Sequence, residues 1–377
     1  MNYINLINAF DREIEVLEVT EDAMIYAVDR KDDSKNRCDI EKLDFNLQKT
    51  EPLIRLDYTR IYESFQTYRQ NPDFFYAVNV LSDYRVRLRR VDKQQWQIHE
   101  DILLNAEGEV LSLYVLDERY LLVTDEVVKD ETYTKIYGEP ETDSRYMTLC
   151  YLYDVKTGEK FPITDRRFGC LPDTVRTYRT PHGLKTMIIT ADRALYTTDT
   201  KAFAAAASSG QTLPMTAVRT AEADGPVYFI SDNPEGFYYR INSGQTETVY
   251  FCGCDGSEKQ LYVYPYDSGE TYFYDMTNGH IFCTQSQDGE KSVKRLACVT
   301  DSMLSLSFEQ DYGDFTGICT KDLFLTAFYK EVQVKEDTEF RECVAVHYMD
   351  GRTPDIFEGR CMYDGGKVIL LRSFLAL

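Results

Sequence analysis

Three arginines alternate along one short stretch of the chain, YRVRLRRV at residues 84–91. Successive side chains of a β-strand point to opposite faces, so Arg85, Arg87 and Arg89 are expected on one face and the intervening valine and leucine on the other. Three aligned guanidinium groups could receive a carboxylate or a phosphate. They could equally pair with an aspartate or glutamate of a neighbouring strand. We predict Arg85, Arg87 and Arg89 as the candidate binding residues, with such ion pairs as the alternative.

Histidines and cysteines offer little for acid–base or metal chemistry. No two of the four histidines share a metal-ligand spacing, and each is expected to be a structural or surface residue: His99, His182, His280 and His347. The one close thiol pair is Cys252-Gly253-Cys254, which could hold a metal or a redox disulfide. A zinc site needs two more ligands and the sequence has no second pair, so we expect two strand-end cysteines around a glycine kink.

Catalytic signatures are also missing from the sequence. It contains no Gly-x-Ser-x-Gly elbow, phosphate-binding loop, dinucleotide fingerprint or His-Glu-x-x-His. We therefore predict no catalytic residue, no metal site and no cofactor.

Charge and segment composition limit the possible partners. The 377 residues include 63 acidic and 42 basic ones, and the resulting net charge of −21 repels phosphate backbones, so no nucleic-acid partner is expected. The first residues lack the basic and apolar regions of a signal peptide, and no apolar run approaches the roughly 18 residues of a membrane helix. The ten cysteines are scattered, many in apolar strands such as Cys343–Val346, which suits reduced thiols. We predict a cytoplasmic protein without a membrane partner.

Short strands joined by tight turns are the dominant pattern. The chain has 29 tyrosines and 20 phenylalanines against one tryptophan, and aromatic residues favour sheets over helices. Residues 228–251 give the template, with predicted strands at Tyr228–Ser231, Phe237–Asn242 and Thr246–Phe251 separated by Asn-, Pro- and Gly-containing turns. Similar turns recur near residues 46, 92, 156, 200, 243, 288 and 350, mostly about 45 residues apart. Each hairpin follows further apolar runs, which gives about four strands per unit.

A propeller explains these repeats because a four-stranded sheet cannot bury both of its faces alone. Stacking such sheets face to face buries both faces of each one. A β-sandwich is the competing all-β interpretation, but it requires fewer and longer strands and no regular period. We predict an all-β fold, a single β-propeller of four-stranded antiparallel blades formed by residues 1–377. Seven blades are expected, or eight if both termini build a shared blade.

The ends and three polar segments depart from the repeat. Strand-like residues at Tyr3–Ile7 and Lys367–Phe374 are left over, and we expect strands from both termini to close the ring. Thr124–Tyr146 is predicted as a long excursion, and Asp311–Lys321 and Glu331–Glu339 as segments that lengthen the seventh unit. A short helical turn is expected at 202–207. No linker suggests a domain boundary.

Two stretches, VYFISDNPEGFYYRINSGQ and LCYLYDVKTGEKFPIT, resemble the strand–turn–strand repeats of bacterial TolB-like propellers and of YWTD-type propellers. The resemblance covers about five units and departs from those families in lacking their usual tryptophan and a regular Trp-Asp dipeptide. It implies a propeller fold and a tendency to bind proteins or peptides. It carries over no catalytic residue, because the matching positions are structural.

The leading functional hypothesis is a non-catalytic propeller that binds or scaffolds another protein or peptide. The alternative is a propeller-type hydrolase or lyase that acts on a small or sugar-like substrate in the central channel, where residues from several blades converge without sequence proximity. A third possibility is a subunit of a larger assembly, marked by an exposed apolar patch.

Overall fold

The computed structural model describes most of the chain, apart from short internal gaps and the two ends. The described residues are 3–30, 37–57, 65–81, 84–138, 144–168, 172–233, 235–265, 271–275, 279–286, 293–300, 304–334 and 337–373. They divide into two compact units, one formed by Met1–Asp57 with Asp267–Leu377 and the other by Tyr58–Tyr266. We call these unit 1 and unit 2 and describe each by itself.

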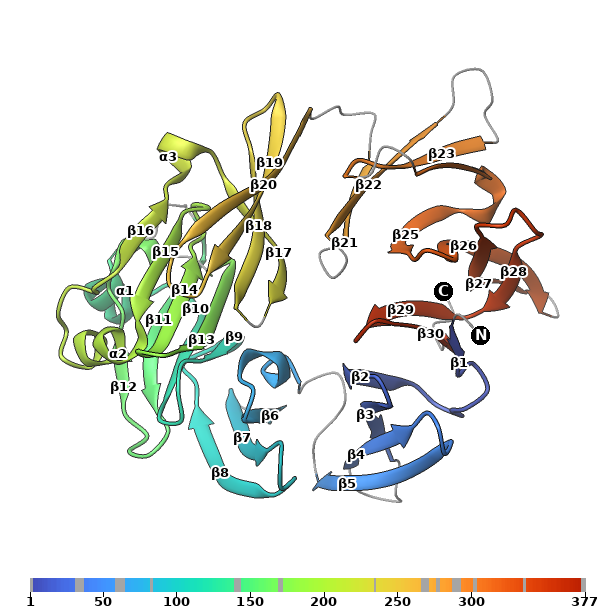
Figure 1. Ribbon diagram of the computed structural model, residues 1–377. Coiled ribbons are helices and arrows are strands. Elements are labelled where there is room, and N and C mark those ends of the chain that lie inside the picture. The colour runs from blue at the N-terminus through green and yellow to red at the C-terminus, as the bar shows by residue number, and fades with distance from the viewer. Residues whose placement is uncertain are drawn as a thin grey trace. The chain divides into compact units, whose positions relative to one another are not determined.

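Unit 1 contains three four-stranded antiparallel sheets and one three-stranded sheet (Figure 1). The four-stranded sheets are β2 (Ile14–Val19), β3 (Ala23–Asp29), β4 (Arg37–Asp44) and β5 (Lys49–Asp57); β21 (Thr271–Asp275), β22 (His280–Ser286), β23 (Val293–Cys298) and β24 (Ser305–Glu309); and β25 (Asp314–Cys319), β26 (Leu323–Val334), β27 (Asp337–Tyr348) and β28 (Asp355–Glu358). The fourth sheet has the order β1 (Ile4–Asn5), β30 (Lys367–Leu371) and β29 (Arg360–Asp364). We call it the terminal sheet, because strands from both ends of the chain build it.

Unit 2 contains one three-stranded sheet and three four-stranded sheets, and each sheet consists of strands that follow one another along the chain (Figure 1). Their strands are β6 (Phe74–Val80), β7 (Arg85–Asp92) and β8 (Ile98–Asn105); β9 (Glu109–Val115), β10 (Tyr120–Val128), β11 (Tyr146–Asp154) and β12 (Lys160–Pro162); β13 (Thr174–Thr180), β14 (Gly183–Ile189), β15 (Leu195–Asp199) and β16 (Thr216–Arg219); and β17 (Val227–Asn233), β18 (Gly236–Asn242), β19 (Thr246–Gly253) and β20 (Glu258–Pro265).

This series of small antiparallel meanders confirms the predicted all-β fold, a β-propeller built of blades. The described residues form eight sheets, so the alternative with a blade shared by both termini is the one observed. In the shared sheet, β1 runs parallel to β30, with Ile4 opposite Ile369 and Asn5 opposite Leu370.

Neighbouring sheets within each unit cover each other's faces. In unit 2 one hydrophobic cluster joins the sheet of β6–β8 to the sheet of β9–β12, with Tyr76 and Leu88 from the first packed among residues that include Val123 from the second. In unit 1 another cluster joins β25–β28 to the terminal sheet, through residues that include Val344 and Leu370. Stacked faces therefore provide the core, as the edge-and-face argument predicts.

The turn positions used to define the repeat are not equivalent in the structure. Turns near residues 46 and 156 join the third and fourth strands of their sheets, whereas the turn near 243 joins β18 and β19, the second and third strands. A regular spacing holds best for the last sheets, which begin at Val227, Thr271, Asp314 and Arg360.

Three predicted interruptions are partly strand. Thr124–Tyr146 continues β10 as far as Val128 and then forms helix α1 (Glu131–Tyr137). Asp311–Lys321 includes β25, the first strand of its sheet, and Glu331–Glu339 lies mostly in a long hairpin of β26 and β27. The predicted excursion thus includes the end of β10 and a helix, and the two segments predicted to lengthen the seventh unit contribute strand residues to β25, β26 and β27.

Helices are few and short in the described part of the chain. The expected helical turn at 202–207 is confirmed as α2 (Thr200–Ser208), which begins where the side chain of Asp199 accepts a 2.9 Å hydrogen bond from the Ala202 N–H. The third α-helix is α3 (Ala221–Asp224), and single 3₁₀ turns lie at η2 (Tyr68–Gln70), η3 (Arg166–Phe168) and η4 (Gln310–Tyr312). None of the described helices has the length and apolar character needed to span a membrane.

Candidate functional site

The three predicted binding arginines lie on one face of β7, as their alternation requires. Arg85 is opposite Asn105, Arg87 opposite Leu103 and Arg89 opposite Asp101 across the pairing with β8. Arg87 donates from Nε to Asp101 at 2.8 Å, and this hydrogen bond lowers the pKa of Asp101 from its usual value. Arg89 is almost fully buried. The cross-strand ion pair considered as the alternative is therefore present at Arg87, and a ligand-binding role for the three arginines stays a prediction.

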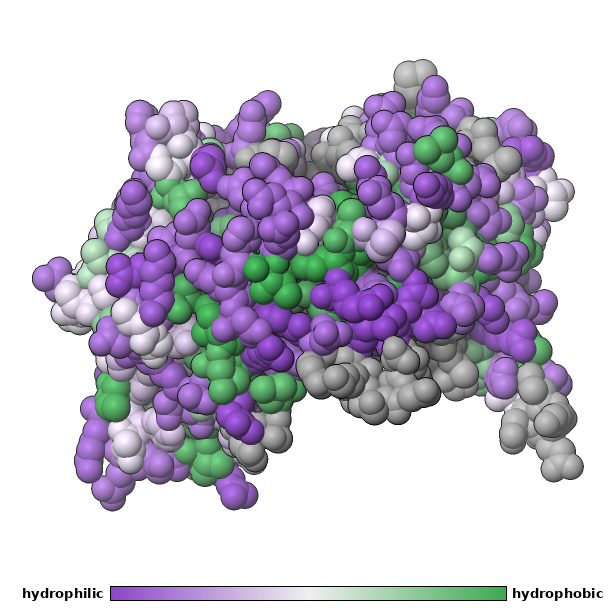
Figure 2. All heavy atoms as spheres, turned by 90° about the horizontal axis from the view of Figure 1, so that it is seen from below, coloured by the Kyte–Doolittle hydropathy of each residue, from purple (hydrophilic) through white to green (hydrophobic). Residues whose placement is uncertain are grey.

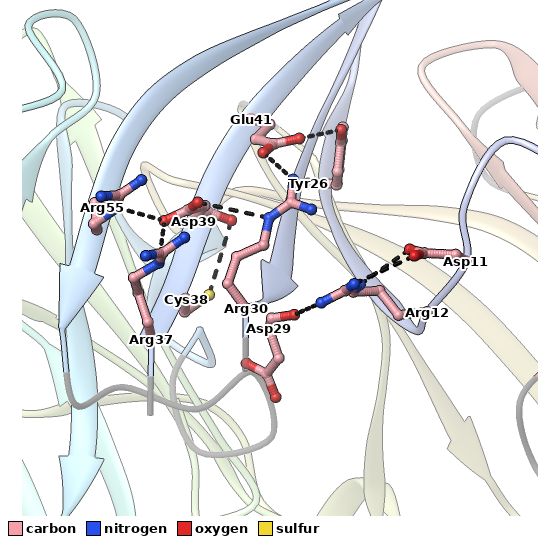
Figure 3. A network of polar contacts seen from close by, with 10 residues as sticks. All are labelled: Asp11, Arg12, Tyr26, Asp29, Arg30, Arg37, Cys38, Asp39, Glu41 and Arg55. Carbon is pink, nitrogen blue, oxygen red and sulfur yellow. Dashed lines mark hydrogen bonds and ion pairs between the residues drawn. The ribbon is translucent and has the colours of Figure 1, made fainter. Parts of the chain in front are cut away.

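A second group of arginines, which sequence reasoning missed, surrounds Asp39 in unit 1 (Figure 3). Arg30 Nε lies 3.6 Å from Asp39 Oδ2, while Arg37 Nε and Arg55 Nε lie 3.5 and 3.1 Å from Oδ1. The three arginines come from the end of β3, from β4 and from β5. Alternation along β4 indicates from the sequence only that Arg37 and Asp39 share a face. Arg30 and Arg55 come close to Asp39 because of how β3 and β5 pair with β4, which the sequence pattern does not show.

Glu41 extends this network toward the core. Its carboxylate accepts a 2.6 Å hydrogen bond from the Tyr26 hydroxyl and lies 2.5 Å from Arg30 Nη2. Burial, and then the hydrogen bond to Glu41, raises the pKa of Tyr26. The buried carboxylates of Asp39 and Glu41 therefore form ion pairs with the arginines. We interpret the group as a structural ion-pair network.

Asp125 on β10 is a buried acid of unit 2 whose carboxyl group is only partly hydrogen-bonded. It is fully buried, and Oδ2 accepts hydrogen bonds from the Glu107 N–H at 2.8 Å and from the Tyr151 hydroxyl at 3.0 Å. Oδ1 has no hydrogen-bond partner among the described residues. Burial raises the pKa of Asp125 to about 6. Because the carboxyl group is buried, it presents no atom to a substrate, and we interpret it as a structural acid.

Two histidines, His347 and His280, contact neighbouring protein side chains, and the cysteines of the described ranges form no disulfide. His347 stacks on Phe324 with ring centroids 4.4 Å apart and shares a 2.9 Å hydrogen bond with Thr326 Oγ1, and burial lowers its pKa to about 4. His280 Nδ1 lies 3.7 Å from Cys298 Sγ, a contact that sequence spacing does not indicate. All cysteines within the described ranges are free, including Cys252 and Cys254. Those ranges contain no group of three acidic, histidine or cysteine residues placed to hold a metal.

A groove in unit 1 is the candidate functional site. Its volume is about 730 Å³, and its walls come from β27, from β28, from β1 of the terminal sheet and from residues that flank this sheet. Two large apolar side chains on its rim are exposed to solvent, Phe340 by 45% and Ile356 by 52%. The full lining is Asn5, Ile7, Asn8, Glu339–Glu342, Ile356–Gly359, Arg372 and Ser373. We call this site the β27 groove.

The outer edge of β27 is only half covered by strand pairing. β28 pairs with Cys343–Val346, whereas β26 pairs with β27 along its whole length. Beside 337–342, the described residues place no further strand on this edge. The four lining residues of β27, Glu339–Glu342, belong to that uncovered half.

Gly359 is the residue at which the chain leaves the edge of β27. Its N–H donates a 2.9 Å hydrogen bond to the Glu342 carbonyl, and the chain then enters β29. Its φ is +156°, and a Cβ there would lie 2.2 Å from the carbonyl oxygen of Leu371. Only glycine fits this close approach without displacement, so Gly359 fixes the distance between the β27 edge and the terminal sheet.

Charged residues of the groove are partly paired. Arg341 lies between two carboxylates, with Nη1 3.1 Å from Glu358 Oε2 and Nη2 3.6 Å from Glu339 Oε2. Glu342 makes no ion pair within the described residues. The face that Figure 2 shows is mostly hydrophilic, with hydrophobic groups between the polar ones. This groove therefore combines exposed apolar side chains with an acidic residue that makes no ion pair within the described part of the chain.

Comparisons with known proteins extend to the fold only. No protein family matches the chain, and no curated protein matches it. Among solved structures, an uncharacterized protein, lmo1340, from Listeria monocytogenes EGD-e is 11% identical, with 98% of this chain and 97% of that chain covered and a TM-score of 0.45. The β-propeller domain of the trilobed protease from Pyrococcus furiosus is 10% identical over 95% and 96% of the two chains, with a TM-score of 0.38.

TolB from Acinetobacter baumannii is 12% identical over 93% of this chain and 83% of its own, with a TM-score of 0.28. The propeller fold that the predicted resemblance to TolB-like proteins implies is confirmed by the sheets described above. The fold assignment itself follows from the sheet topology given above.

Proposed function

We propose that the protein is a non-catalytic β-propeller that binds another protein or a peptide, and that the β27 groove is the site of contact. The observation that carries this proposal is the combination, in one groove, of exposed Phe340 and Ile356 with an uncovered strand edge. Apolar residues exposed together beside charged ones are typical of surfaces that contact other proteins.

The predicted arginines of β7 belong to the proposal as a separate contact site in unit 2. Arg85 and Arg87 are more accessible than Arg89, so they are the two that would reach an acidic group of a partner. A single ring formed by the whole chain, a cytoplasmic location and the lack of a nucleic-acid partner stay predictions from the sequence.

Affinity capture with matched variants tests the proposal. Phe340→Asp with Ile356→Asp places two charges on the rim of the groove. Leu261→Asp with Val263→Asp makes the same change on β20, an edge strand of unit 2 whose apolar side chains are similarly exposed. We expect the wild type and the β20 variant to recover the same partner from lysate of the producing cells, and the groove variant to lose it. Identical recovery with all three proteins, or no recovery with any of them, would contradict the proposal.

A further inference from the structure

The backbone of β27 defines how a partner would bind. In an antiparallel strand, the N–H and C=O of one residue point to the same side, and successive residues alternate between the two sides. The Glu342 carbonyl points away from β26, because it accepts the Gly359 N–H. The pairing of β26 with β27 runs without a register shift, so Phe340 also directs its N–H and C=O away from β26. These groups face the groove that Phe340 lines.

From this geometry we propose that the β27 groove binds an extended cationic peptide, which adds as a strand to the edge of β27 beside Phe340. This inference rests on the proposed function and specifies its partner. An added strand gains main-chain hydrogen bonds from the edge, while pockets for alternate side chains supply specificity. The edge begins where β28 ends, so the peptide occupies the position that β28 would fill if it continued past Glu358.

Side chains on the two faces of the edge give the chemistry of the peptide. Phe340 and Glu342 share one face of β27, and Phe357 lies on that same face because it is opposite Val344. A peptide residue on this face meets an aromatic ring and a carboxylate that has no ion pair within the described residues. Lysine and arginine can contact both the ring and the carboxylate, because their apolar stems cover the ring and their charged ends reach the carboxylate.

The opposite face of β27 favours a different kind of peptide residue. Arg341 is already held between Glu339 and Glu358 there, and Ile356 is exposed beside them. Small apolar or polar residues suit this face, because a further charge would compete with the existing ion pairs. The net charge of −21 on the whole chain also favours the approach of a cationic peptide and disfavours an acidic one.

A buried hydroxyl group in the groove wall, that of Ser373, is consistent with a ligand bound in the groove. Ser373 lines the groove, and its Oγ is buried without a hydrogen-bond partner among the described residues. Buried hydroxyl groups are rarely left without a partner in native proteins. A peptide amide or side chain in the groove would provide one.

Selection from a displayed library tests the inference. The probe is a phage library of random peptides of about ten residues, long enough to span the edge in extended form. It is selected on the full chain, and the enriched peptides are then synthesised. We expect them to carry lysine or arginine at alternate positions and to bind less tightly as salt rises.

Three variants identify the binding mode. Phe340→Pro removes both the outward N–H and the ring, whereas Phe340→Ala removes only the ring. Proline is tolerated at an edge position whose N–H makes no ladder bond, so β26 and β27 remain paired. We expect Phe340→Pro to weaken peptide binding by about tenfold more than Phe340→Ala does, because the main-chain hydrogen bond is lost as well. Val263→Ala on β20 is the control for loss of an exposed side chain and leaves affinity unchanged.

The outcomes separate this inference from the proposed function. Peptides that bind equally to the wild type and to Phe340→Pro would overturn strand addition at β27, while peptide binding by the protein would stand. Enrichment of acidic peptides would also overturn it. If the library gives no peptide that binds the wild type, both proposals fail. Equal thermal unfolding of the wild type and Phe340→Ala, measured first, shows that lost affinity reflects the groove and not the fold.

Discussion

Two grooves, one in each unit, differ in what they can recognise. The β27 groove of unit 1 has a strand edge, four glutamate or arginine residues of β27 and β28, and a volume of about 730 Å³. A smaller groove of about 460 Å³ in unit 2 is lined by Val80, Leu81, Tyr84, Val86 and Gly108–Val110, with Glu109 as its one charged lining residue. We call it the β7–β9 groove.

The difference shows why volume and apolar lining do not define a partner. The β7–β9 groove offers side chains from the β6–β7 turn and the start of β9, and many small apolar groups would suit it equally. Both grooves have an acidic lining residue, but the β27 groove adds the directional hydrogen-bonding groups of an uncovered strand edge, which favour an extended chain. The direction of these hydrogen-bonding groups, rather than the volume, makes the β27 groove specific.

The largest expected effect comes from a glycine in each groove. A Cβ at Gly359 would lie 2.2 Å from the Leu371 carbonyl oxygen, and one at Gly108 would lie 2.0 Å from the Glu126 carbonyl oxygen. We expect Gly359→Ala and Gly108→Ala each to lower the free energy of unfolding by on the order of 3 kcal/mol, because backbone must shift. Urea unfolding measures this.

Peptide binding then distinguishes the two glycine variants. At a temperature where both remain folded, Gly359→Ala is expected to weaken binding of the selected peptide, because it moves the terminal sheet relative to β27. Gly108→Ala is expected to leave affinity unchanged. Equal loss in the two variants would mean that general destabilisation, not groove geometry, controls binding.

An intermediate effect concerns the buried acid beside the β7–β9 groove. Asp125 is the cross-strand partner of Val110, which lines that groove. Its pKa is raised to about 6 in the folded protein, so its contribution to stability is present at low pH and is lost as pH rises through about 6. Relative to Asp125→Asn, we expect the wild type to lose on the order of 2 kcal/mol of unfolding free energy between pH 4 and pH 7.

Unfolding of both proteins across this pH range is the measurement. The difference between them isolates Asp125 from other groups, such as His347 of unit 1, whose lowered pKa acts in the opposite direction. Peptide affinity at the β27 groove should be the same for the wild type and Asp125→Asn. A difference curve that is flat with pH would show that the carboxyl group titrates normally.

The smallest expected effect is electrostatic. Glu342→Lys reverses the one groove carboxylate without an ion pair in the described chain, and Glu109→Lys makes the same change in the β7–β9 groove. We expect the first to weaken binding of a lysine-containing peptide by about fivefold at low salt and the second to have little effect, because Glu109 does not line the β27 groove. Titration calorimetry at two salt concentrations measures both. Equal weakening would indicate that net charge alone attracts the peptide.

The fold was largely predictable, because its signals are local. Strand length, alternation and turn residues around stretches such as Phe237–Asn242 predict the meanders, and strand-like residues left at both ends predict the shared terminal sheet. Where each sheet begins within the repeat was not predictable. A turn between the second and third strands, as at residue 243, contains the same types of residue as a turn between the third and fourth strands.

The candidate site was much less predictable. Alternation placed Arg85, Arg87 and Arg89 on one face of β7, but it could not identify Asp101 as a partner. The β27 groove was missed because its residues lie far apart in sequence and because 331–339 was predicted only as a polar segment that lengthens the seventh unit, without a strand. Val332 and Val334, alternating with polar neighbours, were the available signal for a strand. Where β28 ends and the chain departs at Gly359 depends on pairing that no local pattern contains.

Hydrogen exchange at the β27 edge tests the central claim most directly. Amide exchange of 339–342 is measured by NMR with and without a saturating amount of the selected peptide. Strand addition predicts that the Phe340 amide becomes protected, while the Arg341 amide, which points toward β26, changes little. An unchanged Phe340 amide under saturation, or protection that appears instead at Gly108–Val110, would contradict the account.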